Sequence, residues 1–330
     1  MVDRRCPDFS LEGPRGPLPI IQRYCIWANI HIACFGYLNG VTLEHPAAST
    51  IANRNASTSL IHRAKAMKVY NYPDVKTILV CGDIHGNFEG IVHKLCVEYD
   101  CMDTLLIVAG DCGFGFKKPE YYEQIYSRFA GILRKANNYV AFIRGNHDDP
   151  SYFAEEKVHH QRWRCVPDYS VIRAWVHNIL CIGGATSVDR KERQEMNARM
   201  RQRGQFQTAA WWPDEVPVFL PEVIDSIFEN FQIDTVVTHT APSFCETAGW
   251  KSTCLKPWAT NDPALLQDVD KERATMDEIY ERIAVRHWVR RWFYGHFHRS
   301  WCGERDHIMF TLLDIEEFKE IYEQIDPYRF

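Results

Sequence analysis

The stretch "ILVCGDIHGNFEG", residues 78–90, begins as a short apolar run and ends in polar residues and glycines. The run Ile78–Cys81 has the length of a short buried strand, and Gly82 marks its end. Asp83 and His85 follow at once, so this strand delivers a carboxylate and an imidazole to its carboxyl end. A single pair of this kind is ordinary turn chemistry. The pair indicates a site only if other strands of the chain end in the same way.

Two further apolar runs do end in this way. Residues 104–109 lead into "GDCGFG", and residues 139–143 lead into "RGNHDD". Between them, apolar side chains recur at helical spacing and form one apolar face. These side chains are Tyr122, Ile125, Phe129, Ile132 and Leu133. Strands that alternate with helices predict βαβ units and a largely parallel sheet, whose ligands collect beyond the carboxyl ends of the strands.

The second half of the chain continues the pattern less regularly. Strands are expected within residues 178–187, 234–242, 290–300 and 307–315. The second of these contains His239, and the third contains His296 and His298. The intervening segments, about 189–230 and 243–289, are expected to be helical and loop-like.

The composition is that of an ordinary globular protein. The chain has 330 residues, of which 46% are hydrophobic and 25% charged, so it can bury a sizeable core. A formal net charge of −5 provides no general attraction to nucleic acid or acidic membranes. The twelve cysteines include no CxxC pair, which predicts reduced thiols and a cytoplasmic enzyme.

Residues 1–66 differ from the rest of the chain. They contain several prolines and the polar stretch "AASTIANRNASTS", without a sustained helical or strand period. We expect an N-terminal extension of low order, or a misassigned start, followed by one domain over residues 67–330. Residues 24–42 carry no full charge and resemble a signal or anchor loosely, but polar side chains interrupt the apolar run. No membrane association is therefore expected.

The polar residues at the strand ends are carboxylates, imidazoles and one amide. They are Asp83, His85, Asp111, Asn146, His147, Asp148, His239, His296 and His298. Mixed oxygen and nitrogen donors without cysteine suit divalent ions such as Mn²⁺, Fe²⁺ or Zn²⁺. The set is too large for one ion, and an aspartate in its middle could bridge two. The sequence therefore predicts a dimetal site.

The order of these blocks resembles the calcineurin-like metallophosphoesterases, in particular their bacterial and phage-type phosphatases. In this chain the blocks are Asp83-Ile84-His85, Gly110-Asp111-Cys112-Gly113, Gly145-Asn146-His147-Asp148, His239 and Gly295-His296-Phe297-His298. The resemblance covers about residues 76–300. It implies an α/β fold in which a two-sheet β-sandwich is flanked by helices, in four layers.

The resemblance also implies a role for each residue. One metal would be held by Asp83, His85 and His298, and the other by Asn146, His239 and His296. Asp111 would bridge the two metals. His147 would point to the leaving-group oxygen as general acid, and Asp148 would orient its ring. If the "GHFH" segment is extended, His296 and His298 point the same way, so either the glycine turn separates them or the ions lie side by side.

The chemistry of this arrangement is metal-dependent hydrolysis of a phosphate ester. Two cations about 3.5–4 Å apart neutralise the anionic ester and clamp the attacking and leaving oxygens of an in-line displacement by a metal-bound hydroxide. A positioned imidazolium that protonates the leaving group typically contributes about 10²–10⁴-fold. We therefore expect a phosphomonoesterase or small phosphodiesterase that acts on a phosphorylated small molecule or a phosphoprotein.

The substrate is less well determined than the chemistry. The second block lacks the Asp-Arg pair of phosphoprotein phosphatases, which argues against a eukaryotic-type role. Arg190 lies just past a Gly-Gly turn and is a candidate for gripping phosphate, although its segment could also be a solvated helix face. A nucleotide-polyphosphate hydrolase remains an alternative, as does a nuclease with stacking tryptophans, for which the acidic charge is unfavourable. A non-catalytic interaction scaffold would require decayed metal blocks.

Overall fold

The strand before the opening motif is buried on both faces. In β2 (Thr77–Cys81), Ile78 and Val80 belong to one apolar cluster, whereas Leu79 and Cys81 belong to another. Because successive side chains of a strand point to opposite faces, the sheet that contains β2 is covered on both sides. The computed structural model shows two sheets of this kind.

The structure describes most of the chain from residue 67 onward. The described residues are 67–206, 208–245, 250–286 and 288–322. The predicted extension, residues 1–66, which includes the uncharged segment 24–42, lies outside them. None of the helices formed by the described residues has both the length and the apolar character needed to cross a membrane.

The strands that lead into the first three motif blocks belong to a six-stranded sheet. Its four inner strands are parallel: β2, β3 (Thr104–Val108), β4 (Tyr139–Phe142) and β6 (Trp163–Cys165). Antiparallel strands form both edges, with β13 (Phe318–Glu320) beside β2 and β5 (His159–His160) beside β6. Since the inner strands run in the same direction, the three blocks leave the sheet at the same edge.

The strands that lead into the last two blocks belong to a seven-stranded sheet, whose strand order is β1-β7-β8-β9-β10-β12-β11. Strands β8, β9, β10 and β12 run parallel to one another, so the segments after β9 and β10 also leave at one edge. The strands are β1 (Val69–Tyr72), β7 (Ser170–Ala174), β8 (His177–Ile182), β9 (Thr235–Thr238), β10 (Arg291–Tyr294), β11 (Trp301–Arg305) and β12 (Ile308–Leu312).

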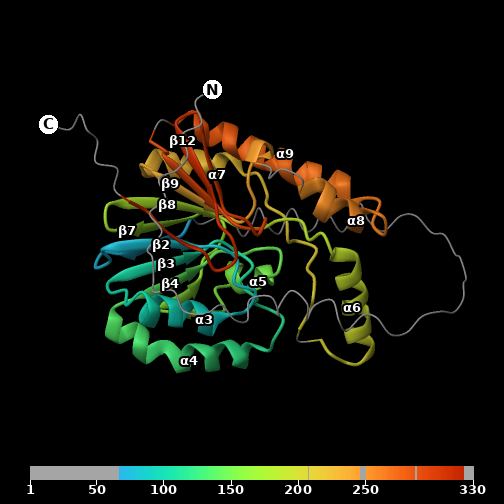
Figure 1. Cartoon of the computed structure of the whole chain (residues 1–330), viewed down its shortest axis with the longest axis horizontal. Helices are drawn as coiled ribbons and strands as arrows, with labels where there is room; N and C mark the ends of the chain where they lie inside the picture. Colours follow the sequence, from blue (N-terminus) through green and yellow to red (C-terminus); the bar gives the residue numbers. More distant parts are fainter. Residues whose placement is uncertain (1–66, 207, 246–249, 287, 323–330) are drawn as a thin grey trace, which may run out of the picture. The chain divides into compact units, whose positions relative to one another are not determined.

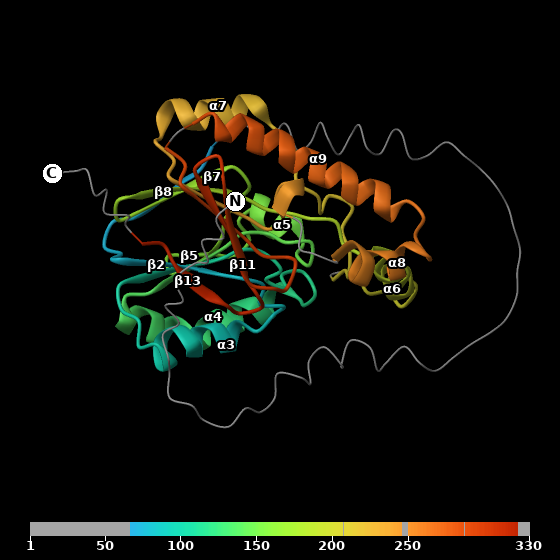
Figure 2. The same ribbon diagram turned by 45° about the horizontal axis from the view of Figure 1, so that its top comes forward.

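Helices cover the outer face of each sheet (Figure 1). Helices α3 (Phe88–His93) and α4 (Pro119–Ala136) lie along the six-stranded sheet, whereas α7 (Pro221–Asn230) and α9 (Leu265–Ala284) lie along the seven-stranded sheet. Figure 2 shows the same separation from a second direction. The remaining elements are η2 (Lys94–Glu98), α5 (Pro150–Ala154), α6 (Arg190–Gln202), η3 (Ser243–Cys245), η4 (Lys251–Leu255) and α8 (Lys256–Ala259).

Three apolar clusters fill the spaces between these layers. The middle cluster joins the sheets, because it contains Ile107 of β3 together with Phe293 of β10. A second cluster packs Leu106 against the α3–α4 side, and a third packs Trp292 against the α7–α9 side. The neighbouring residues Leu106 and Ile107 therefore serve different cores, as strand alternation requires. This four-layer arrangement confirms the predicted two-sheet α/β fold flanked by helices.

Candidate metal centre

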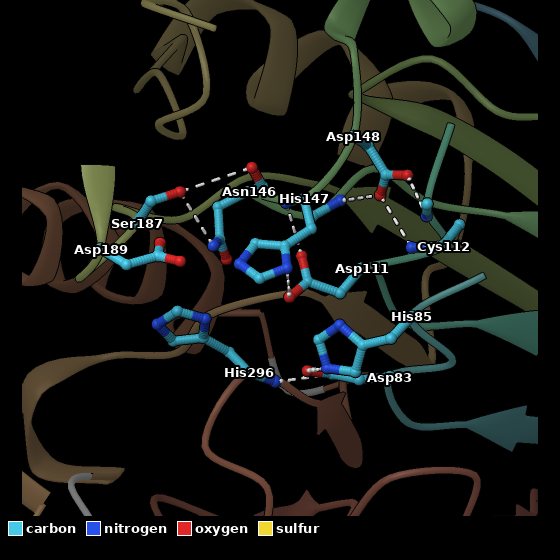
Figure 3. A network of polar contacts seen from close by, with 12 residues as sticks. Asp83, His85, Asp111, Cys112, Asn146, His147, Asp148, Ser187, Asp189 and His296 are labelled. Carbon is cyan, nitrogen blue, oxygen red and sulfur yellow. Dashed lines mark hydrogen bonds and ion pairs between the residues drawn. The ribbon is translucent and has the colours of Figure 1, made fainter. Parts of the chain in front are cut away.

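The predicted ligands come from five strands of both sheets and meet where these strands end. Asp83 follows β2, Asp111 follows β3 and Asn146 follows β4, whereas His239 follows β9 and His296 follows β10. Figure 3 shows how several of these side chains converge. Asp83, Asp111, Asn146 and His239 are all almost completely buried. The site therefore takes carboxylates, an amide and imidazoles out of water and places them beside one another.

Left-handed backbone turns direct several of these side chains into the site. The φ angles are 44° at His85, 47° at Asp111, 69° at His296 and 49° at His298. A non-glycine residue in this region costs about 1–3 kcal/mol and is typical of functional sites. The turns also settle the question of the two "GHFH" imidazoles. The ring of His298 reaches Asp83, whereas the ring of His296 packs against that of His239.

Two motif glycines are required by close approach of the blocks. A Cβ atom on Gly145 would lie 2.1 Å from the backbone nitrogen of Asp111, and one on Gly295 would lie 2.2 Å from Asp83 Oδ1. Both distances are far inside van der Waals contact. Because only glycine lacks this atom, the two residues allow one block to rest against the ligand of another.

The first group of donors surrounds Asp83. One ligand atom from each of Asp83, His85, Asp111 and His298 lies within 4.8 Å of the others. His298 Nε2 is 3.0 Å from Asp83 Oδ2 and 3.0 Å from His85 Nε2. Burial raises the pKa of Asp83, but His298 and the nearby His239 outweigh it and hold this pKa below its ordinary value. The carboxylate is therefore ionised and available to a cation.

The second group of donors surrounds His239. Its Nδ1 lies 2.8 Å from the carbonyl oxygen of Ala109, while its Nε2 lies 3.0 Å from Asn146 Oδ1 and 3.2 Å from Asp111 Oδ1. A neutral imidazole has one N–H, so the donation to Ala109 leaves the lone pair of Nε2 facing two oxygen atoms.

This arrangement is stable only if a proton or a cation lies between Nε2 and those oxygens. Without a cation, burial lowers the pKa of His239, but Asp111 and Asp83 outweigh this effect and raise the pKa to about 9. With a cation, the Nδ1–H bond to a carbonyl is the usual way to hold a ligating histidine. The residues of this group therefore fit a metal ion.

His296 completes the second group. Its ring centroid is 5.0 Å from that of His239, and its backbone N–H donates to Asp83 Oδ1 over 2.9 Å. Burial, together with the charge of His239, lowers the pKa of His296 to about 3. The ring is therefore neutral and keeps a lone pair for a metal.

Asp148 has different contacts from those expected. Its carboxylate accepts backbone N–H bonds from Cys112, Gly113, Phe114 and Gly145, at 2.7–3.0 Å. These bonds join the second block to the third, and Figure 3 shows part of this network. The ring of His147 instead contacts Arg193 and approaches Asp111. Among the described contacts, the Asp148 carboxylate thus joins two loops of the site, and none links it to the His147 ring.

Arg193 is the functional candidate that the sequence reasoning missed. Its Nη2 lies 2.9 Å from His147 Nε2, and its Nε donates to Asp189 Oδ2 over 2.7 Å. Arg190, the predicted phosphate grip, instead forms ion pairs with Asp262 and Asp268 at 2.5 and 2.9 Å. Both arginines belong to α6, on which they lie three positions apart. Only the helix packing determines which of them faces the site.

A sequence model described as calcineurin-like phosphoesterase matches residues 76–300 of this chain. The chain belongs to the calcineurin-like phosphoesterase family. The matched region includes every predicted ligand, from Asp83 to His298. The cluster of Asp83, His85, Asp111 and His298 is thus the metal-binding site of a metal-dependent phosphoesterase.

Two solved structures illustrate how distant its similar proteins are. Phosphopantetheinyl hydrolase (PptH) from Mycobacterium tuberculosis has 13% identity and a TM-score of 0.38, over 77% of this chain and 98% of that chain. Cold-active protein-tyrosine phosphatase of a Shewanella species has 12% identity and a TM-score of 0.29, over 77% of this chain and 75% of that chain. The comparison with curated proteins gave no match.

Replacing Asp111 by alanine should lower the metal content of the purified phosphoesterase. Asp111 approaches donors of both groups, so its loss leaves each group one oxygen short. The matched control is Asp103→Ala, because Asp103 lies at the other end of β3 and pairs with Lys76. Elemental analysis after saturation with Mn²⁺ measures the ratio of metal to protein. Equal metal content in the Asp111→Ala variant and the wild type would contradict the assignment.

Proposed function

We propose that this phosphoesterase holds two divalent cations and hydrolyses a phosphomonoester or a small phosphodiester. The observation that carries the proposal is that Asp111 belongs to both groups of donors. It lies within reach of Asp83, His85 and His298, and its Oδ1 is 3.2 Å from His239 Nε2. A carboxylate shared by two such groups can bridge two ions, as in other two-metal hydrolases.

The ligands divide between the two cations as follows. Asp83, His85 and His298 hold one, Asn146, His239 and His296 hold the other, and Asp111 contributes to both. The mixed oxygen and nitrogen set favours Mn²⁺, with Fe²⁺ and Zn²⁺ as the alternatives. When bound, the cations supply charge neutralisation and Lewis-acid activation for transfer of the phosphoryl group to water.

His147 is the proton donor in this proposal. Its side chain is 23% exposed, and its Nδ1 lies 3.8 Å from Asp111 Oδ2, so the ring faces both the site and solvent. Burial lowers the pKa of His147 to about 4; Asp111 opposes this shift and Arg193 adds to it. A bound phosphate brings negative charge that raises this pKa again. Substrate binding therefore favours the protonated form of His147, which then protonates the leaving-group oxygen.

Arg193 holds the phosphate beside His147. Its guanidinium donates to Asp189 and to the carbonyl oxygen of Ala210, and its Nη2 faces the His147 ring. A guanidinium held in this way is planar and fixed, which suits two oxygens of a phosphate. We assign the predicted role of Arg190 to Arg193, because Arg190 is paired with two carboxylates, Asp262 before α9 and Asp268 in the first turn of α9.

The alternative functions are less well supported by these contacts. A nuclease would need a basic groove with stacking aromatics. The Phe116 ring lies 6.4 Å from that of His147 and 5.4 Å from that of Trp212, measured between centroids. However, Asp189 offsets the charge of Arg193. A nucleotide-polyphosphate hydrolase would use the same two-metal chemistry. A non-catalytic scaffold does not explain why both donor groups are intact.

The cytoplasm remains the proposed location. Of the nine described cysteines, eight are free thiols, five of them buried, whereas Cys302 is disulfide-bonded. Free, buried thiols are typical of proteins in a reducing compartment. A phosphorylated small molecule or a phosphoprotein would be available there as substrate.

A panel of substrates tests the function directly. With Mn²⁺ we expect hydrolysis of p-nitrophenyl phosphate or bis-p-nitrophenyl phosphate, and EDTA should abolish it, because the cations provide the activation. The assays are repeated with Zn²⁺ in place of Mn²⁺. The other substrates of the panel are a phosphopeptide, a dinucleoside polyphosphate and single-stranded DNA. Release of two nucleotides, or cleavage of DNA, as the fastest reaction would favour an alternative. Inactivity towards every member would contradict the proposal.

Replacing His147 by alanine should reduce turnover about 10²–10⁴-fold on an alkyl phosphate while two metals remain bound. The loss should be much smaller on p-nitrophenyl phosphate, whose leaving group departs without a proton. Steady-state rates on both substrates and elemental analysis of the variant measure these effects. His93→Ala, at an exposed histidine of α3, is the control. An equal loss on both substrates would show that His147 is no proton donor.

Replacing Arg193 by alanine should raise KM about 10- to 100-fold without changing the metal content. A hydrogen bond to a charged group contributes about 1.5–3 kcal/mol, which corresponds to this range. Arg190→Ala is the matched control on the same helix and should leave KM within about twofold. The reverse result, a raised KM for Arg190→Ala alone, would return the phosphate grip to Arg190.

A further inference from the structure

The side-chain amide of Asn146 is held from its outer end by Ser187. Asn146 Nδ2 donates to Ser187 Oγ over 3.1 Å (Figure 3). At the other end of the amide, Asn146 Oδ1 lies 3.0 Å from His239 Nε2. The two ends of an amide have similar shape but opposite chemistry, since only the oxygen can bind a cation. A contact that distinguishes the ends therefore decides whether Asn146 can act as a ligand.

Ser187 can distinguish the two ends of the amide because its hydroxyl proton is already donated to Glu215. Its Oγ donates to Glu215 Oε2 over 2.6 Å, and its backbone N–H donates to Glu215 Oε1 over 2.9 Å. The alternative acceptor, the carbonyl oxygen of Asn146, is 3.5 Å from the hydroxyl and thus much weaker. A serine hydroxyl has one proton, so only lone pairs remain towards Asn146. The amide must therefore present its NH₂ to Ser187 and its oxygen to the site.

Glu215 is itself held in place by Arg144, which lies in the loop that contains Asn146. Only 2% of Glu215 is exposed, and its carbonyl oxygen accepts a 2.6 Å bond from Arg144 Nη1. Arg144 Nη2 also donates to the carbonyl oxygen of Val216 over 3.0 Å. Because Arg144 lies two positions before Asn146, the contacts form a closed circuit. The circuit runs from Arg144 to Glu215, then through Ser187 back to Asn146.

We propose that Ser187 and Glu215 are positioning residues that hold the Asn146 amide with its oxygen towards the cation beside His239. The inference rests on the proposed two-metal function and deepens it. Neither residue is a ligand, and both act through Asn146. Their loss should weaken one cation and spare the other, because the donors Asp83, His85 and His298 make no use of the circuit.

Glu215→Gln is the sharpest test. An amide at position 215 can donate to Ser187 Oγ, so the serine proton turns towards Asn146 and favours the inverted amide. Isothermal titration calorimetry of the metal-free full chain with Mn²⁺ measures the affinities of the two cation sites. We expect one site to weaken about 10- to 100-fold, as is usual for partners of ligands, and the other to remain unchanged. Ser187→Ala, which only removes atoms, should weaken the same site.

Two matched controls separate positioning from general damage. Glu272 is also buried and accepts the backbone N–H of Thr186, next to Ser187, but has no described contact with Asn146. Ser170 is fully buried, and its hydroxyl has no hydrogen-bond partner among the described residues. Glu272→Gln and Ser170→Ala should therefore bind both ions as the wild type does.

A double variant tests whether the effect passes through Asn146. In an Asn146→Ala background, Glu215→Gln should cause no further loss of affinity, whereas a merely structural effect would add to the first. Unchanged affinity in both Glu215→Gln and Ser187→Ala, an additive loss, or an equal loss in the controls would overturn the inference. A wild-type chain that binds fewer than two ions would instead overturn the proposed function, and the inference with it.

Discussion

The burial of two carboxylates at the meeting point of two sheets is the constraint on which the rest of the site depends. Asp83 and Asp111 are only 1% and 2% exposed, and a buried charge must be matched by protons or cations. The surrounding imidazoles, and the left-handed turns at His85, Asp111, His296 and His298, bring that compensation close. Parallel strands make the arrangement possible, because they deliver side chains from distant parts of the sequence to one edge.

The supporting contacts extend well beyond the ligands. Asp148 ties the second block to the third through backbone N–H groups. On the other side of the site, Arg273 of α9 donates to the carbonyl oxygen of Pro242 over 2.7 Å, and its guanidinium lies 5.0 Å from the Phe297 ring. The outer helical layer thus holds the loops that carry His239 and the "GHFH" segment. The metal site therefore depends on both sheets, whose strands end at its donors, and on the helical layer that contains α9.

The sequence predicted the strands that end in ligands because both signals are local: a short apolar run and the polar residues directly after it. Strands β1 and β7 were missed, since their pairing links residues about one hundred positions apart, with Val69 opposite Val171. The proposed choice of Arg193 over Arg190 could not be made from the sequence for a related reason. It depends on ion pairs with Asp262 and Asp268, which the sequence of α6 does not contain. The partners of Asp148 are main-chain groups, which no residue pattern reveals.

The close approach at Gly145 and Gly295 bears on attempts to build such a centre elsewhere. Copying the seven proposed donor side chains onto another scaffold would not reproduce the close crossing of the backbones that carry them. In this chain, Asp111 rests against Gly145, and Asp83 rests against Gly295, at distances that exclude any side chain. A designed centre would also need a glycine wherever two loops approach this closely. The smallest unit that can be transferred is therefore the set of packed loops.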